Sequence, residues 1–262
     1  MTTTGPLVLV AHGSRDPRAA LANHALARAV SLAAPGTDVR VAFLDHAGPR
    51  LGQVLFSVGG APRATVVPLL LTSAYHGQVD IPAALAEARA AGLRLPVAVA
   101  DVLGPVDGSV DDLLLAALRR RLLAADAAAR VWSAGGPPLD GVVLAAAGTR
   151  SVPAQATVSL AASALGRALR GVPCSVAYAS AAGPTGAEAV ASLRAAGARR
   201  VGVASYFLAP GLLYESVTAS ARGAGAAVVA EPLGAASELA RLVLARAATA
   251  RLVCFRQPSL VA

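Results

Sequence analysis

Two histidines stand just beyond apolar runs that are typical of buried strands. His12 follows the run 7–11, and His76 comes a few residues after the run 64–71. In an open parallel sheet, ligands bind outside the carboxyl ends of the strands. Imidazole binds borderline divalent metals when neutral, and it accepts protons as a general base. Two histidines are too few for a closed structural zinc site, so the pair predicts an open site that holds a metal loosely.

Four residues near these histidines are candidates for substrate binding. Ser14 and Arg15 lie in the first loop, where backbone N–H groups at a helix start bind anions and arginine pairs with a carboxylate through two hydrogen bonds. Asp45 ends the second expected strand as an electrostatic or metal-guiding carboxylate, and Tyr75 either packs or contacts a ligand beside His76.

The other two histidines receive weaker functional interpretations. His24 falls inside the first expected helix, where packing or solvent exposure explains it. His46 follows Asp45, so it also faces the expected edge of the cleft. Each cleft histidine taken alone could instead be a loop residue that caps a backbone group. The equivalent loop positions of His12 and His76 favour the functional interpretation.

The elements that would position these residues alternate between strand and helix. In the first half we expect strands at 7–11, 39–45, 64–71 and 95–100, and helices at 17–33, 50–58, from about 82 onward, and 110–125. In the second half we expect strands at 141–147, 174–179, 200–207 and 226–230, and helices at 152–169, 184–196, 212–222 and 235–248. This alternation predicts right-handed βαβ units and parallel sheets.

The pattern breaks at residues 133–138 and then repeats. Residues 11–16 correspond to 146–151, a shift of 135, and residues 71–77 correspond to 205–211, a shift of 134. In this alignment Ala147 and Pro210 stand where the first half has His12 and His76. We therefore predict an α/β protein of two similar doubly wound lobes, 1–132 and 133–262. Each lobe has a mainly parallel four-stranded sheet, and a cleft lies between them.

Composition restricts the partners. The formal net charge is +8, all basic side chains are arginine, and 55% of the residues are hydrophobic. A basic surface favours anions, but scattered arginines and few aromatic residues argue against nucleic acid. The run Arg119-Arg120-Arg121 is expected to be a solvated helix end.

Several site classes are excluded by their missing motifs. The first strand lacks a G-x-G-x-x-G loop, the chain has no phosphate-binding lysine motif, and no G-x-S-x-G elbow occurs. Apolar runs are interrupted by proline or glycine, and the cysteines show no metal spacing. We expect a cytoplasmic protein without a membrane span, with Cys174 and Cys254 as reduced thiols.

Two motifs resemble those of a known family. Residues 7–17 (LVLVAHGSRDP) and 67–82 (VPLLLTSAYHGQVDIP) are similar to the two histidine motifs of the class II sirohydrochlorin chelatases. The similarity covers residues 7–118 well, and the second half resembles the degenerate repeat of the fused, two-lobed members. Phe43-Leu44-Asp45 stands where the family often has Phe-Leu-Glu, so the shorter carboxylate reaches less far.

The resemblance implies a lyase of siroheme or cobalamin biosynthesis, a form of porphyrin biosynthesis. It would insert Fe²⁺ (first choice) or Co²⁺ (second) into sirohydrochlorin, without ATP or an organic cofactor. His12 and His76 match the family's metal-binding and catalytic histidines. The fused halves predict a monomer. Two other hypotheses stay open: a non-catalytic metal or tetrapyrrole carrier, and a regulatory module that binds a small anion.

Overall fold

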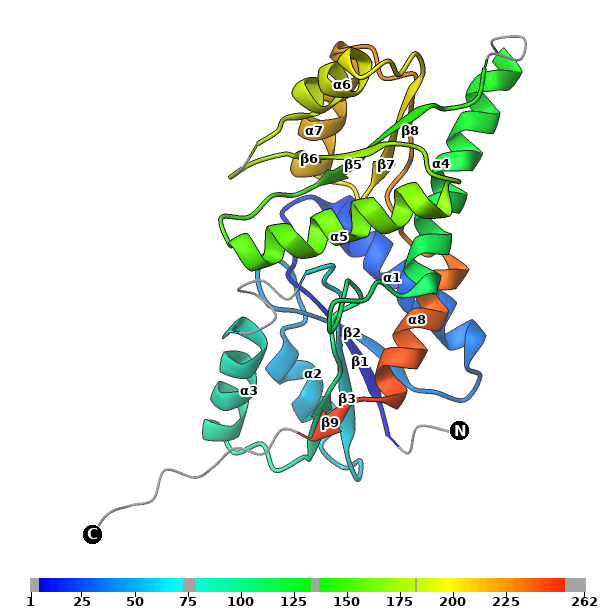
Figure 1. Cartoon of the computed structure of the whole chain (residues 1–262). Helices are drawn as coiled ribbons and strands as arrows, with labels where there is room; N and C mark the ends of the chain where they lie inside the picture. The colour runs from blue at the N-terminus through cyan, green and yellow to red at the C-terminus, as the bar shows by residue number, and fades with distance from the viewer. Residues whose placement is uncertain (1–4, 73–78, 133–136, 182, 253–262) are drawn as a thin grey trace.

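The computed structural model describes residues 5–72, 79–132, 137–181 and 183–252 (Figure 1). Its first half contains β1 (Leu7–Ala11), α1 (Pro17–Ala33), β2 (Val39–Phe43), α2 (Leu51–Ser57), β3 (Ala64–Pro68), α3 (Ile81–Ala90), β4 (Val97–Val99) and α4 (Asp112–Trp132). Its second half contains β5 (Gly141–Ala146), α5 (Val152–Ala168), β6 (Cys174–Tyr178), α6 (Gly186–Ala195), β7 (Val201–Ser205), α7 (Leu212–Gly223), β8 (Val228–Val229), α8 (Ser237–Ala248) and β9 (Arg251–Leu252).

The strands form two sheets with the same internal order. The first runs β2-β1-β3-β4-β9 and the second β6-β5-β7-β8. All pairings are parallel except that of β9, which adds to β4 in the antiparallel direction. The two-lobed α/β prediction is confirmed, with one difference: the first sheet is mixed and five-stranded. β9 has only two residues, which give no strand periodicity, so local patterning did not reveal it.

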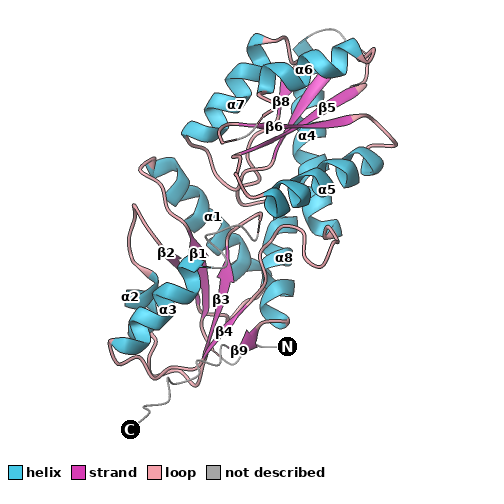
Figure 2. Cartoon of the chain, turned by 60° about the vertical axis from the view of Figure 1, so that its left-hand side comes forward, coloured by secondary structure: helices cyan, strands magenta, loops and turns pink. Residues whose placement is uncertain are grey.

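Both sheets are covered by helices on both faces (Figure 2). In the first lobe α2 and α3 pack on one face through Leu55, Ile81 and Leu85, all buried. In the second lobe α6 and α7 take the corresponding face. The remaining faces of both sheets share one continuous apolar core that includes Leu9 and Leu144. Strands buried on both faces explain the near-continuous apolar runs in the sequence.

The two lobes exchange their fourth helices across this shared core. α4 comes from the first half but contacts β7 and β8 of the second sheet. α8 comes from the second half but packs on α1 and β3 of the first lobe, and the chain then enters β9 (Figure 1). Each lobe therefore needs one helix from the other half of the chain. The predicted domain boundary at residues 132/133 therefore stays a prediction about where the sequence repeat begins. In the folded chain each lobe includes a helix from the other side of that boundary.

Charged contacts hold the exchanged helices. Arg200 pairs with Asp126 of α4, and both side chains are largely buried. Arg120 of α4 donates from Nε to Glu238 of α8 at 2.6 Å, and Arg121 donates to the Leu233 carbonyl at 3.0 Å. The expectation of a solvated helix end was wrong in its placement, because α4 continues to Trp132 and the arginine run lies in its middle. The side chains of Arg120 and Arg121 bind partners that lie over 100 residues away in the chain, which helix-end patterning does not show.

No helix in the described part of the chain is long and apolar enough to cross a membrane. Cys174 is a free thiol, whereas Cys254 lies outside the described residues. Burial raises the pKa of the Cys174 thiol to about 12, so it stays protonated and packs as a small apolar side chain.

Candidate active site

A cleft of about 1120 Å³ lies between the lobes. It is lined by the segments that follow β1, β3, β5 and β7, at residues 11–16, 69–72, 146–151 and 206–214. The carboxyl ends of both sheets thus face one cavity, as the sequence predicted. Its volume slightly exceeds the range of about 300–1,000 Å³ that is usual for small-molecule pockets.

Local geometry places His12 on the wall of this cleft. β1 is fully buried, and Gly13 turns the chain with a φ of +100°. A Cβ on Gly13 would lie 1.8 Å from the Asp45 carbonyl oxygen, so only glycine fits this turn. Asp16 then caps α1 by accepting from the Arg18 backbone N–H at 2.9 Å. The strand end, the glycine and the cap together hold the imidazole at the cleft.

His46 joins His12 on the same wall. The ring centroids of His12 and His46 are 6.0 Å apart, with an interplanar angle of 84°. His46 has a φ of +58°, a left-handed conformation that aims its side chain into the cleft lining. The expectation that His46 faces the cleft edge is confirmed. Two imidazoles in one pocket provide nitrogen ligands or proton acceptors.

Asp45 is engaged beside the cleft and is not among its lining residues. Its carboxylate accepts from the His46 backbone N–H at 2.8 Å and from Arg50 at 3.1 Å. These two contacts, the His46 hydrogen bond first, lower the pKa of Asp45 below its usual value. The side chain is 52% exposed and lies 3.5 Å from His46 Nε2. Substrate binding by Asp45 stays a prediction.

Ser14 and Arg15 both line the cleft. Ser14 Oγ accepts from the Asp16 backbone N–H at 3.1 Å, which stabilises the turn before α1. Tyr75 and His76 lie outside the described residues, so the pairing of His12 with His76 stays a prediction. Among the residues that the structure describes, no group of three His, Cys, Asp or Glu side chains could hold a metal ion.

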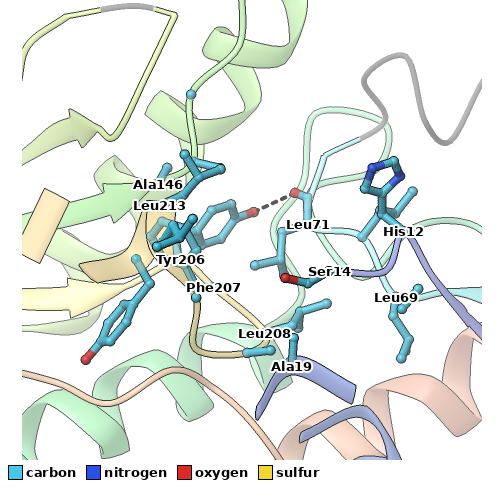
Figure 3. A pocket seen from close by; sticks show the side chains of 18 of the residues that line it. His12, Ser14, Ala19, Leu69, Leu71, Ala146, Tyr206, Phe207, Leu208 and Leu213 are labelled. Carbon is cyan, nitrogen blue, oxygen red and sulfur yellow. Dashed lines mark hydrogen bonds between the residues drawn. The ribbon is translucent and has the colours of Figure 1, made fainter. Parts of the chain in front are cut away.

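The opposite wall comes from the second lobe and is mostly apolar. Ala147 stands at the position equivalent to His12, and the segment 206–214 adds aromatic and aliphatic side chains (Figure 3). Tyr206 donates from its hydroxyl to the Leu71 carbonyl of the first lobe at 2.9 Å. Burial raises the pKa of Tyr206, so the phenol stays a donor. This contact was missed at the sequence level because its partners are 135 residues apart.

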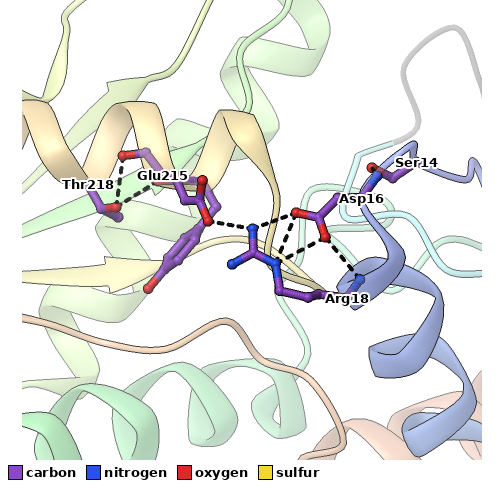
Figure 4. Close-up of polar contacts among 6 residues, drawn as sticks. Ser14, Asp16, Arg18, Glu215 and Thr218 are labelled. Carbon is purple, nitrogen blue, oxygen red and sulfur yellow. Dashed lines mark hydrogen bonds and ion pairs between the residues drawn. The ribbon is translucent and has the colours of Figure 1, made fainter.

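An ion-pair bridge joins the lobes beside the cleft (Figure 4). The Arg18 guanidinium lies 2.5 Å from Asp16 and 2.5 Å from Glu215, which is in the first turn of α7. The hydrogen bonds from Arg18 lower the pKa of Asp16. Arg18 and Glu215 are about half exposed, so this bridge stabilises the lobe arrangement only weakly.

The hydrogen bonds of the strands correct one part of the repeat alignment. Leu69 N–H donates to the Val10 carbonyl, and Tyr206 N–H donates to the Ala145 carbonyl. Val10 and Ala145 are equivalent at a shift of 135, so Leu69 is equivalent to Tyr206 at a shift of 137, and the expected shift of 134 was wrong here. Residues 69–80 connect β3 to α3, whereas residues 206–211 connect β7 to α7. The second lobe thus has half the connection length where the first carries His76, so a single-residue exchange of His76 for Pro210 does not describe the difference.

Comparison with known proteins supports the class that this geometry defines: a duplicated α/β protein with a ligand cleft between the strand ends of its lobes. SirB from Bacillus subtilis with Fe³⁺ is 20% identical, with a TM-score of 0.74 over 93% of this chain and 94% of that one. SirB from Bacillus subtilis subspecies spizizenii in complex with cobalt is 18% identical, with a TM-score of 0.73 over 94% of each chain. A structure of CbiX described as the terminal enzyme for biosynthesis of siroheme in denitrifying bacteria is 23% identical, with a TM-score of 0.59 over 92% of this chain and 98% of that one.

The family model named CbiX matches residues 6–125 and 141–250. The chain therefore belongs to the CbiX family, the class II sirohydrochlorin chelatases, in their two-lobe form. No curated protein matches the chain significantly.

Proposed function

We propose that this protein inserts a divalent metal into sirohydrochlorin, with Fe²⁺ as first choice and Co²⁺ as second. The observation that carries the proposal is the position of His12: a strand-end imidazole on the wall of a large inter-lobe cleft, with a second imidazole 6.0 Å away. Relatives of the same fold hold Fe³⁺ or cobalt, which fits either metal as substrate.

The two walls of the cleft suit the two parts of the reaction. Metal insertion releases two pyrrole protons and replaces the metal's outer ligands with ring nitrogens. His12 accepts a proton or holds the incoming metal, and His76 is proposed as its partner in both roles. The apolar wall at 206–214 covers a face of the macrocycle and excludes water. No ATP or organic cofactor is required.

Polar groups around the histidine wall would bind the substrate's carboxylates. Ser14 and Arg15 line the cleft directly. Asp45 and Tyr75 complete the proposed substrate-binding set, with Asp45 acting through its contacts to His46 and Arg50. Because one chain supplies both walls, we propose a monomer that works in the cytoplasm.

The test is anaerobic absorption spectroscopy of sirohydrochlorin with Fe²⁺ or Co²⁺, with and without protein. We expect the protein to accelerate the spectral change with at least one metal. His24→Ala is the matched control for a His12→Ala variant in this assay, because His24 is exposed on α1 and outside the cleft lining. A protein that binds sirohydrochlorin but leaves the spontaneous rate unchanged would be a carrier, and the enzyme proposal would fail.

A further inference from the structure

Two arginines face the cleft from equivalent loops of the two lobes. Arg15 follows β1 and Arg150 follows β5, at the repeat shift of 135. Both are exposed, and both line the cavity that contains His12.

The loops that carry these arginines have the same geometry. Gly13 and Gly148 turn with φ values of +100° and +98°. Ser14 Oγ accepts from the Asp16 N–H at 3.1 Å, and Thr149 Oγ1 accepts from the Ser151 N–H at 3.1 Å. The side chains at positions 15 and 150 therefore leave equivalent backbone frames on opposite walls of one cleft.

The frame does not need these guanidinium groups. Glycine turns, hydroxyl groups and helix caps provide all the contacts just described. Within the described part of the chain, neither Arg15 nor Arg150 makes a hydrogen bond or ion pair. Other arginines with a place in the fold do so: Arg18, Arg50, Arg120, Arg200 and Arg246 each bind a carboxylate. Arg15 and Arg150 are instead the two arginines that line the cleft, so their guanidinium groups are available to a ligand there.

We propose that Arg150 binds a carboxylate of the ligand and that Arg15 binds another from the facing wall. This inference rests on the proposed function, because it takes the ligand to be a large ring with several carboxylates. Arginine suits the role, since its planar fork forms two hydrogen bonds to one carboxylate and is always charged. The second lobe has no histidine at position 147 but keeps the anion-binding arm of the same loop.

The test measures binding of metal-free sirohydrochlorin by absorption or fluorescence titration, so it does not depend on turnover. Arg150→Gln is expected to weaken binding about tenfold, the usual effect of losing a charge-assisted hydrogen bond. Arg15→Gln should have a similar effect, and the double variant should lose about a hundredfold if the two sites are independent. Arg150→Lys should recover part of the loss, because it restores charge without the fork.

Arg18→Gln is the matched control, since it removes one positive charge beside the cleft from a guanidinium that Asp16 and Glu215 already bind. We expect its affinity to stay within about twofold of the wild type, because this exposed guanidinium is already paired with two carboxylates and acts on the ligand only through screened attraction. Wild-type affinity in Arg150→Gln, or a loss of affinity no larger than that of Arg18→Gln, would overturn the proposal that Arg150 binds a ligand carboxylate. If Arg150→Gln binds sirohydrochlorin more weakly but the wild type inserts no metal, the carboxylate-binding role of Arg150 is supported and the proposed reaction is refuted.

Discussion

The loops after β1 and β5 share one backbone but not one chemistry. Gly13 and Gly148 each fill a turn where a Cβ would lie within 2 Å of a carbonyl oxygen, of Asp45 and of Ser180 respectively. Within this common frame the second lobe has Ala147 at the position where the first has His12. The frame therefore accounts for the turn and the helix start in both lobes, and His12 needs a separate reason.

The loops after β2 and β6 also share a backbone conformation but differ in side chain. His46 and Ala181 are equivalent at a shift of 135, and both adopt left-handed φ values, +58° and +64°. The unusual backbone thus persists in the second lobe without the imidazole. Both described histidines of the cleft belong to the first lobe, so we expect metal chemistry at the first wall only, whereas both walls carry groups proposed to bind the ring.

The largest effect is expected from removing His12, the imidazole that the second lobe lacks. His12→Ala should slow metal insertion by about a hundredfold or more, because a positioned proton acceptor typically contributes that much. Stopped-flow absorption with sirohydrochlorin and Fe²⁺ or Co²⁺ measures the rate. Adding Ala147→His to that variant should not restore the rate, because the second lobe lacks the longer loop that follows β3. Restoration would show that the lobes are interchangeable.

The second prediction tests how far each lobe depends on the other. Asp126→Asn leaves the largely buried Arg200 without its carboxylate and should lower the free energy of unfolding by about 3 kcal/mol. Urea unfolding measures the change. The control is Asp38→Asn, which removes an exposed pair with Arg40 and should change stability by less than about 0.5 kcal/mol. Equal effects would mean that α4 is not held as the exchanged packing requires.

A third prediction follows from the pair between the exchanged helices. The Arg120 hydrogen bond lowers the pKa of Glu238 from 4.5 to about 2. The folded state therefore favours ionised Glu238. The ion pair's contribution to the free energy of unfolding is present above about pH 4.5 and is lost as the pH falls toward 2. Thermal unfolding of Glu238→Gln should show a flatter decline across that window. Half-exposed Arg120 limits the difference to about 1 kcal/mol. Parallel curves for both proteins would contradict the assignment.

The smallest effect is expected at the bridge beside the cleft. Glu215→Gln removes one partner of Arg18 and should reduce unfolding free energy by less than about 0.5 kcal/mol, because both groups are about half exposed. The midpoint of urea unfolding provides the measurement. A loss above about 1 kcal/mol would mean that this pair, and not only the exchanged helices, holds the lobes together.

Local periodicity predicted most elements, and long-range packing supplied the rest. The strand Leu7–Ala11 and the helix Pro17–Ala33 have the bounds that apolar patterning and the Asp16 cap indicated. The helix exchange was not predictable, because the amphipathic pattern of α4 shows that one face is buried but not which sheet that face packs on. β9 was missed because two residues carry no period. The repeat alignment was right where the glycine turn marks it and wrong at β3, where the two lobes differ in loop length.

The site was partly predictable for the same reason. His12, Ser14, Arg15 and His46 line the cleft because strand ends in parallel sheets converge there. Arg150 was visible in the repeat through its spacing from Gly148. Tyr206 was not, since its bond to Leu71 depends on how the two lobes face each other.

The separate roles proposed for His12 and Arg150 are tested most directly by measuring sirohydrochlorin affinity and the insertion rate at saturating sirohydrochlorin in two variants. We predict that His12→Ala retains affinity within a few-fold and loses insertion, whereas Arg150→Gln loses affinity and inserts metal at close to the wild-type rate once saturated. The same pattern of loss in both variants would contradict the account, because it would mean that His12 and Arg150 do not have separate roles in insertion and binding.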